Sequence, residues 1–242
     1  MIIDVHAHYG KWFFAIEATG IKDMLHILDK YGIKRCILSS SLAVVYDFRE
    51  GNAELDQILD KDERLLGYVV VNCNYLRESR RALGRYLSKN KFVGVKMHPT
   101  YTRQPINSLA SMAMMDIIEE YGVPLLLHTY GAETAQVEEA AKAHPDLKII
   151  MGHMGGDMWL KAIEVAKRTP NTWLELCCSC QETGKVEQAV EAVGAQRMLF
   201  GSDLTLIDPA WTLGMVKDAH ITAKEREMIL RGNAKQLFGL QL

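Results

Sequence analysis

Eight short runs rich in valine, isoleucine and leucine recur along the 242 residues of this chain. They are IIDVH (2–6), IKRCILS (33–39), LLGYVVVN (65–72), FVGVKMH (92–98), VPLLLH (123–128), LKIIMGH (147–153), TWLELCC (172–178) and RMLFGSD (197–203). The segments between them place apolar residues at helical spacing, as in INSLASMAMMDIIEEYG and AETAQVEEAAKAHP. Nearly continuous apolar strands that alternate with helices predict a parallel sheet covered by helices on both faces.

Eight strand–helix units in a chain of this length predict a (β/α)8 TIM barrel, and we expect residues 1–242 to form one domain. An open doubly wound sheet is the alternative fold, but no glycine-rich phosphate-binding pattern follows the first strand. Gly32 and Gly122 each stand just past the last periodic residue of a helical segment, where a helix is expected to end.

Charge and cysteine content limit the partners and the compartment. The formal net charge is -2, so nothing favours nucleic acid or an anionic membrane, and we expect a small-molecule substrate. The chain has no apolar stretch of the roughly 18 residues that a membrane span needs, and its first residues lack a signal-peptide pattern. Five cysteines, an odd number, argue against a disulfide framework. We expect a soluble, cytoplasmic protein, and the sequence leaves a homo-oligomer open.

Polar residues that close the apolar runs are the candidates for the site, because barrel enzymes place their active sites at the carboxyl ends of the strands. Five of the eight runs close with such residues, namely His6 and His8, Lys96 and His98, His128, His153, and Asp203. The remaining histidines fall in helical segments or at their edges, at His26, His144 and His220. Histidines scattered at random would not separate in this way.

The first run ends in a His–x–His pattern. Residues two apart in a strand point to the same face, so His6 and His8 are expected to project together. Neutral imidazole is the commonest side-chain metal ligand, so a metal ion is the natural occupant between them. The same parity puts Lys96 and His98 on one face of the fourth strand.

The chain resembles the amidohydrolase superfamily and, within it, the amidohydrolase-2 group that includes the aminocarboxymuconate-semialdehyde decarboxylase-like enzymes. The matching motifs run from residue 3 to residue 240 and are, in order, IDVHAH, GVKMHP, VPLLLHTYG, IIMGHMGG, LFGSD and GNAKQLFGL. The resemblance implies an enzyme with a metal held by the His–x–His pair, the fifth-strand histidine and the eighth-strand aspartate. Those residues are His6, His8, His128 and Asp203. It also implies a catalytic role for the sixth-strand histidine, His153.

Three imidazoles and one carboxylate form a donor set that suits Zn²⁺, our first choice, and leaves Mn²⁺, Fe²⁺ or Co²⁺ open. A metal with an open coordination position lowers the pKa of bound water to about 7. Asp203 is then expected to be catalytic as well as a ligand, because it can accept the proton of that water. His153 is expected to hydrogen-bond the substrate oxygen on which charge develops.

Five residues are candidates for substrate binding: Lys96, His98, Tyr101, Arg103 and Arg49. Lys96 is interpreted as a cation for a carboxylate or phosphate, or as part of a buried ion pair. The superfamily resemblance raises a carboxylated lysine between two metals as an alternative. Both arginines lie in loops that follow strands, and arginine suits the bidentate capture of a carboxylate.

A lone C–x–x–C pattern, CCSC at 177–180, is weak as a zinc site without a second pair, and we interpret it as strand and pocket-wall thiols. Glu175 lies in the same strand and shares parity with Cys177. We interpret it as a paired structural carboxylate rather than as a catalytic one.

We predict a metal-dependent hydrolase that cleaves a C–N or C–O bond of a small, carboxylated amide, ester or lactone by a metal-activated water. A non-oxidative decarboxylase on the same metal scaffold is the alternative, and a non-enzymatic metal- or ligand-binding barrel is the third hypothesis. The decarboxylase-like members commonly follow their His–x–His pattern with a proline-containing segment. YGKWFFAIEATG, at 9–20, has no proline, and this difference favours hydrolysis.

Overall fold

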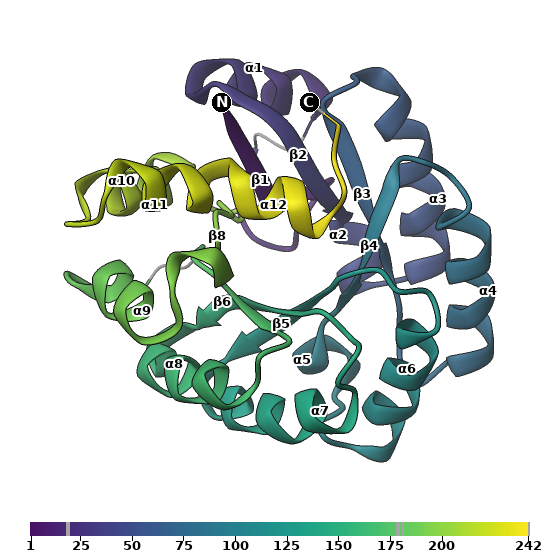
Figure 1. The fold of residues 1–242 in the computed structure, drawn as a ribbon. Coiled ribbons are helices and arrows are strands. Elements are labelled where there is room, and N and C mark those ends of the chain that lie inside the picture. Colours follow the sequence, from purple (N-terminus) through teal and green to yellow (C-terminus); the bar gives the residue numbers. More distant parts are fainter. Residues whose placement is uncertain (18–19, 178–179, 181, 242) are drawn as a thin grey trace.

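The computed structural model describes residues 1–17, 20–177, 180 and 182–241. Eight parallel strands form one sheet in chain order, and helices surround it in a nearly closed barrel (Figure 1). The strands are β1 (Ile2–Tyr9), β2 (Ile33–Ser40), β3 (Leu65–Val70), β4 (Phe92–Met97), β5 (Leu125–Tyr130), β6 (Ile149–Gly155), β7 (Thr172–Glu175) and β8 (Met198–Leu199). Each strand overlaps the apolar run that predicts it, so the predicted TIM barrel is confirmed.

Helices connect the strands on the outside of the barrel. They are α1 (Ile21–Tyr31), α2 (Ser41–Val45), α3 (Phe48–Ile58), α4 (Leu76–Tyr86), α5 (Pro99–Thr102), α6 (Leu109–Glu119), α7 (Val137–Ala143), α8 (Trp159–Arg168), α9 (Lys185–Val193), α10 (Ala210–Asp218), α11 (Ala223–Glu227) and α12 (Asn233–Leu237). Helix α1 ends as predicted at Gly32, whose φ of 69° lies in the left-handed region that glycine adopts without strain.

The last strand is only two residues long, and the chain after it returns to β1. The backbone N–H of Asp203 donates to the carbonyl of His6 over 2.7 Å, and Ala7 forms an isolated parallel bridge with Leu204. The motifs IDVHAH and LFGSD are therefore side by side at one edge of the barrel.

A register shift in β1 changes which side chains face the inside of the barrel. Ile3 and Val5 pack in the inner apolar cluster, which α12 also contacts, whereas Ala7 packs in the outer cluster between sheet and helices. The pairing of β1 with β2 shifts between Asp4 and Ala7. An irregularity of this kind re-aims side chains, so the residues inside the barrel change from Ile3 and Val5 to the two histidines that follow.

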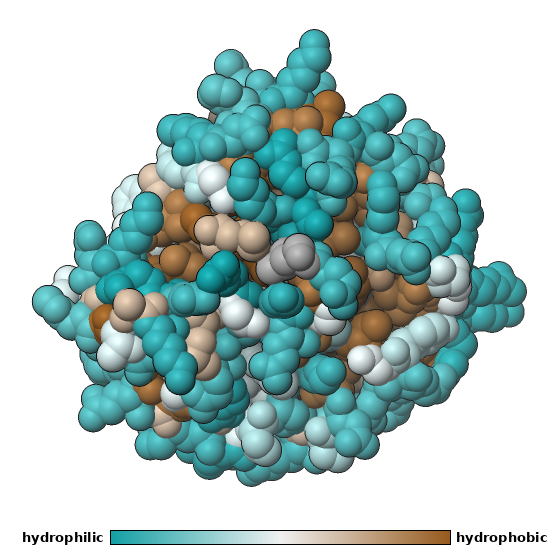
Figure 2. Space-filling model, turned by 45° about the horizontal axis from the view of Figure 1, so that its top comes forward, coloured by the Kyte–Doolittle hydropathy of each residue, from teal (hydrophilic) through white to brown (hydrophobic). Residues whose placement is uncertain are grey.

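Hydrophilic side chains predominate on the face of the molecule that Figure 2 shows, and apolar residues appear there as separate patches. Among the described residues, no helix combines the length and the apolar character that crossing a membrane requires.

Candidate metal centre and active-site cavity

Three predicted ligands meet where β1 ends and the chain leaves β8. The donor atoms of His6, His8 and Asp203 all lie within 4.8 Å of one another, and the three residues are buried. Asp203 Oδ1 is 3.1 Å from His8 Nε2 and 3.8 Å from His6 Nε2. Yet this buried oxygen makes no hydrogen bond within the described part of the chain. A buried carboxylate oxygen facing two imidazole nitrogens without a hydrogen bond fits the coordination of a divalent cation.

The remaining ring nitrogen of each histidine has its own partner. His6 Nδ1 lies 2.7 Å from Glu175 Oε2, and His8 Nδ1 lies 2.9 Å from Ser39 Oγ. Metal-binding histidines usually have their second nitrogen held in this way, which fixes the ring and leaves the first nitrogen for the ion. The Nε2 atoms of both histidines therefore face Asp203, and that of His6 also lies 3.0 Å from Lys96 Nζ.

Gly201 explains why Glu175 can approach His6 so closely. A Cβ atom at this position would lie 2.2 Å from Glu175 Oε1 and 2.7 Å from His6 Cβ. Both distances are shorter than non-bonded atoms tolerate, so a larger residue would push the carboxylate away from the imidazole. The glycine of the LFGSD motif is thus required by packing at the metal centre.

The histidines of the site are neutral. Burial lowers the pKa of each of them, and the charge of Lys96 acts in the same direction; the five are His6, His8, His98, His128 and His153. The pKa of His153 falls to about 4. At Asp203 burial raises the pKa, but His8, His153 and Lys96 together outweigh it and hold the pKa below its usual value. Neutral imidazoles beside an ionised carboxylate are the protonation states that a metal ion requires.

The fourth predicted ligand, His128, lies beside this group. Its Nδ1 is 3.0 Å from His153 Nε2, and its ring stacks on that of His98 with the centroids 3.8 Å apart. All three rings line the same cavity as His8 and Asp203. The structure therefore brings all four predicted ligands to one place, but only three of them form the tight donor group.

Two site residues hold left-handed backbone conformations. His153 has a φ of 63° and Asp203 a φ of 62°. Such conformations cost about 1–3 kcal/mol each in residues other than glycine and persist where the surroundings enforce them. Here the N–H of His153 donates to Glu175 Oε2 over 3.1 Å, and that of Asp203 donates to the carbonyl of His6. The same contacts that orient His6 thus hold the backbone of the two catalytic candidates.

Lys96 is fully buried on β4 and reaches the metal centre. Its Nζ lies 3.0 Å from His6 Nε2. Burial lowers its pKa to about 8, and the negative charge of Asp203 opposes that shift. Lys96 and His98 both line the cavity, as their shared parity predicts.

The cavity above these residues has a volume of about 220 Å³. Aromatic and aliphatic side chains form its walls: Trp12, Phe14, Tyr101, Tyr130, Leu206 and Ile207. Trp12 packs edge-on against the ring of His8, with the centroids 4.9 Å apart, and Tyr101 packs against His98 at 4.2 Å. Tyr101 is thus the one predicted loop residue that the structure places at the cavity.

The two predicted arginines are not at the cavity. Arg49 lies over the rings of Phe48 and Tyr75 and pairs with Asp47 at the start of α3. Arg103 is exposed at the end of α5, where it adopts a φ of 55°. Local packing and helix geometry direct both side chains elsewhere, so the structure gives neither of them a contact with the cavity.

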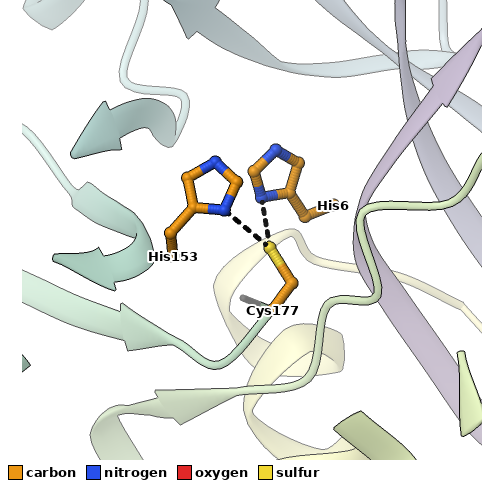
Figure 3. A group of neighbouring side chains, drawn as sticks. All are labelled: His6, His153 and Cys177. Atoms are coloured by element: carbon orange, nitrogen blue, oxygen red, sulfur yellow. Dashed lines mark hydrogen bonds between the residues drawn. The ribbon is translucent and has the colours of Figure 1, made fainter. Parts of the chain in front are cut away.

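Several site residues were not predicted. Ser39, which contacts His8, is the polar residue that closes the second apolar run. Its position at the end of that run was a signal available in the sequence. Trp12 and Phe14 lie in the loop after β1, which has no periodicity, and so left no such signal. Of the C–x–x–C pattern, Cys177 is buried against His6 and His153 (Figure 3), whereas the sulfur of Cys180 lies 3.4 Å from the hydroxyl of Tyr130. Cys178, between them, lies outside the described residues.

A barrel with a histidine–carboxylate cluster at the carboxyl edge of its strands is the architecture of a metal-dependent enzyme. A family model for amidohydrolases matches residues 3–240, and the chain belongs to this family, whose members depend on divalent metals. The resemblance seen in the sequence is therefore confirmed. No curated protein sequence matches the chain.

Solved structures share the fold at low identity. One is a 2,6-dihydroxybenzoate decarboxylase from Rhizobium, with a TM-score of 0.77, 19% identity and 98% of each chain covered. A dihydroxybenzoic acid decarboxylase from a Polaromonas species, solved with bound manganese, has a TM-score of 0.73 and 18% identity over 99% of this chain and 97% of that one. A probable 2-pyrone-4,6-dicarboxylic acid hydrolase from Acinetobacter baumannii has a TM-score of 0.70 and 17% identity over 99% of each chain.

Proposed function

We propose that this protein is a metal-dependent, non-oxidative decarboxylase of a small, planar carboxylic acid. The observation that carries the proposal is a buried lysine beside the metal centre, at the base of a cavity with aromatic walls. The decarboxylases among the similar structures support this reaction over the hydrolysis that the sequence favours.

Substrate binding follows from the charges and shape of the cavity. The histidines are neutral, so Lys96 is the lining residue that offers a positive charge to a carboxylate. A buried charge is costly without a partner of opposite charge, so this lysine favours a substrate that carries a carboxylate. Trp12, Phe14 and Tyr130 provide flat apolar surfaces, which favour a ring or a conjugated chain. A volume of about 220 Å³ limits the substrate to a small molecule.

Loss of carbon dioxide breaks a C–C bond, leaves the electron pair on the remaining carbon and requires a proton at that carbon. Lys96 orients the carboxylate, and the apolar walls exclude water from it. That proton comes from solvent, because Asp203 is ionised and His153 is neutral. Both residues line the cavity, where either can take up the proton and release it to the carbon. A divalent ion held by His6, His8, Asp203 and His128 would supply positive charge that stabilises the electron-rich substrate. The nitrogen and oxygen donors suit Zn²⁺ and Mn²⁺ alike.

Hydrolysis is the second candidate, and one observation favours it. Asp203 Oδ1 has no hydrogen-bond partner among the described residues and is free to accept a proton from an attacking water. That atom serves either reaction, so the products must distinguish them.

The test is product analysis with the metal-loaded protein in ¹⁸O-labelled water. Planar unsaturated carboxylic acids, lactones, amides and small esters are screened, and released CO₂ is assayed in the same reactions. We expect CO₂ without labelled oxygen in the organic product. Label in the product without CO₂ would contradict the decarboxylase proposal and establish hydrolysis. His26→Gln, a change at an exposed position on α1, is the matched control that keeps turnover.

A further inference from the structure

A second cavity lies at the end of the barrel opposite the metal centre, and its volume is about 340 Å³. Lys148 directly precedes β6, Trp173 is the second residue of β7, and Arg197 directly precedes β8. All three therefore lie at the amino ends of the strands. Helix α12 contributes Asn233 and Gln236 to the wall. This cavity shares no lining residue with the one above the metal centre, so the proposed reaction gives it no role.

The charge of this second cavity is positive. Lys148 and Arg197 line it, and among the described residues no carboxylate does. Burial lowers the pKa of Arg197, and this is the effect expected for a cation that has no acidic group beside it. A guanidinium group nevertheless keeps its proton, so its charge remains without a neutralising partner. In a chain with a formal net charge of -2, this local excess of positive charge favours an anion.

Backbone carbonyls hold the Arg197 guanidinium in one orientation. Nη1 donates to the carbonyls of Ala166, over 2.7 Å, and Thr169, over 3.1 Å, at the end of α8. Nε donates over 3.4 Å to the carbonyl of Val193, the last residue of α9. The carbonyl ends of helices favour a cation, which accounts for the position of the arginine. Nη2 makes no hydrogen bond within the described part of the chain, and a donor fixed in advance loses little entropy when it binds an anion.

The other walls suit a flat molecule that carries a hydrogen-bond donor. Trp173 is partly exposed, packs against the inner apolar cluster and provides an aromatic surface. Asn233 is only 5% exposed, and its Nδ2 donates to the carbonyls of Ala195 and Met198, both over 2.7 Å. These two bonds fix the amide. Its Oδ1 has no hydrogen bond among the described residues and is an acceptor for a ligand hydroxyl.

We propose that the cavity at the amino ends of the strands binds a small, flat organic anion. Its carboxylate or phosphate group contacts Arg197 and Lys148, and its ring packs on Trp173. Arginine and lysine bind both kinds of oxyanion, so the choice between them is left to the experiment. The inference goes beyond the proposed function and does not rest on it, because it uses none of the residues of the metal centre.

The direct test is a crystal structure of the metal-loaded protein soaked with 5-bromo-2-hydroxybenzoate, whose bromine is located by its anomalous signal. We expect a bromine peak beside Trp173 and the carboxylate within hydrogen-bond distance of Arg197 Nη2. A peak confined to the cavity at the carboxyl ends of the strands, or no peak at all, would overturn the inference. The first of these results would still support the binding of a carboxylate at the active site, so the two proposals fail separately.

Equilibrium dialysis of 2-hydroxybenzoate against the metal-loaded protein tests the site in solution. Lys148→Gln should weaken binding at this site about 10-fold, as expected for the loss of one hydrogen bond between charged groups. Lys148 is exposed, so the variant should fold and keep its metal content and turnover. Lys235→Gln is the matched control, because Lys235 is an exposed lysine on α12 that does not line the cavity. It should leave the affinity unchanged.

Two further probes define the chemical class of the ligand. Phenyl phosphate that binds more tightly than 2-hydroxybenzoate would identify a phosphate ester, and the reverse order would identify a carboxylate. The neutral 2-hydroxybenzamide, which has nearly the same shape, should bind at least about 10-fold more weakly than the acid. Equal affinity for the amide and the acid would contradict an anion site. Affinities in Lys148→Gln that match those in Lys235→Gln would contradict the location.

Discussion

The β1–β8 side of the cavity and its β5–β6 side hold their histidines in different ways. On the β1–β8 side, His6 and His8 converge on one oxygen of Asp203, and backbone hydrogen bonds between β1 and the segment after β8 fix that arrangement. On the β5–β6 side, His128 and His153 are hydrogen-bonded to each other. On the first side, the donor atoms already converge as a bound cation would require. On the second side, a hydrogen bond joins the two rings. We infer that the β1–β8 side dominates metal affinity and that the β5–β6 side dominates turnover.

The largest effect is expected for Asp203→Asn. The amide removes the negative charge from the centre of the tight donor group, so metal affinity should fall by more than about 100-fold, beyond the range seen for outer partners. Elemental analysis after dialysis should show less than stoichiometric metal, and turnover should be lost. Metal content equal to the wild type would break the distinction between the two sides.

His153→Asn should give the next largest effect, on turnover alone. Loss of one positioned hydrogen-bonding group at a reacting centre costs roughly 10²–10³ in kcat. Metal content should remain stoichiometric because His153 is not part of the His6–His8–Asp203 group. Steady-state kinetics and metal analysis on the same preparation check the turnover and the metal content. A loss of metal in this variant would indicate that His153 is a metal ligand.

His128→Gln should weaken metal binding by roughly 10- to 100-fold, less than Asp203→Asn does. The tight group remains in this variant, and one adjoining donor is lost. Chelator competition measures the difference. Equal losses in the two variants would show that His128 belongs to the tight group when the ion is bound.

The smallest effects are expected for the histidines outside the cavity. His26 is exposed on α1, and His220 lies between α10 and α11 with its backbone N–H bonded to Glu187. His144 bonds to Asp116 and to the carbonyl of Ala140 at the end of α7. Replacing any of the three with glutamine should leave metal content and turnover near wild type. A metal loss at any of them would mean that the cavity does not contain the whole site.

Strand periodicity explains why so much of this arrangement could be predicted from the sequence. Buried parallel strands leave long apolar runs, and the barrel rule then points to the residue that closes each run, which identifies His6, His8, Lys96, His98, His128, His153 and Asp203. The register shift within β1 could not be predicted from the sequence, although it determines that both histidines of the pair face inwards.

The positions of loop residues and the contacts between strands are what could not be predicted from the sequence. Arg49 was expected at the substrate, but its pairing with Asp47 and its packing on Tyr75 depend on how α3 begins. Trp12 and Phe14 reach the cavity through a loop whose course no period encodes. The contacts of Cys177 with His6 and His153 join β1, β6 and the segment after β7, and only the three-dimensional structure brings these together.

The most direct test of the metal centre is a crystal structure of the Mn²⁺-loaded protein with an anomalous-difference map. The account predicts one strong peak bound by His6 Nε2, His8 Nε2 and Asp203 Oδ1, with His128 Nε2 completing the protein ligands and Cys177 outside the coordination sphere. A peak coordinated by Cys177, or a pair of peaks bridged by Lys96, would contradict it.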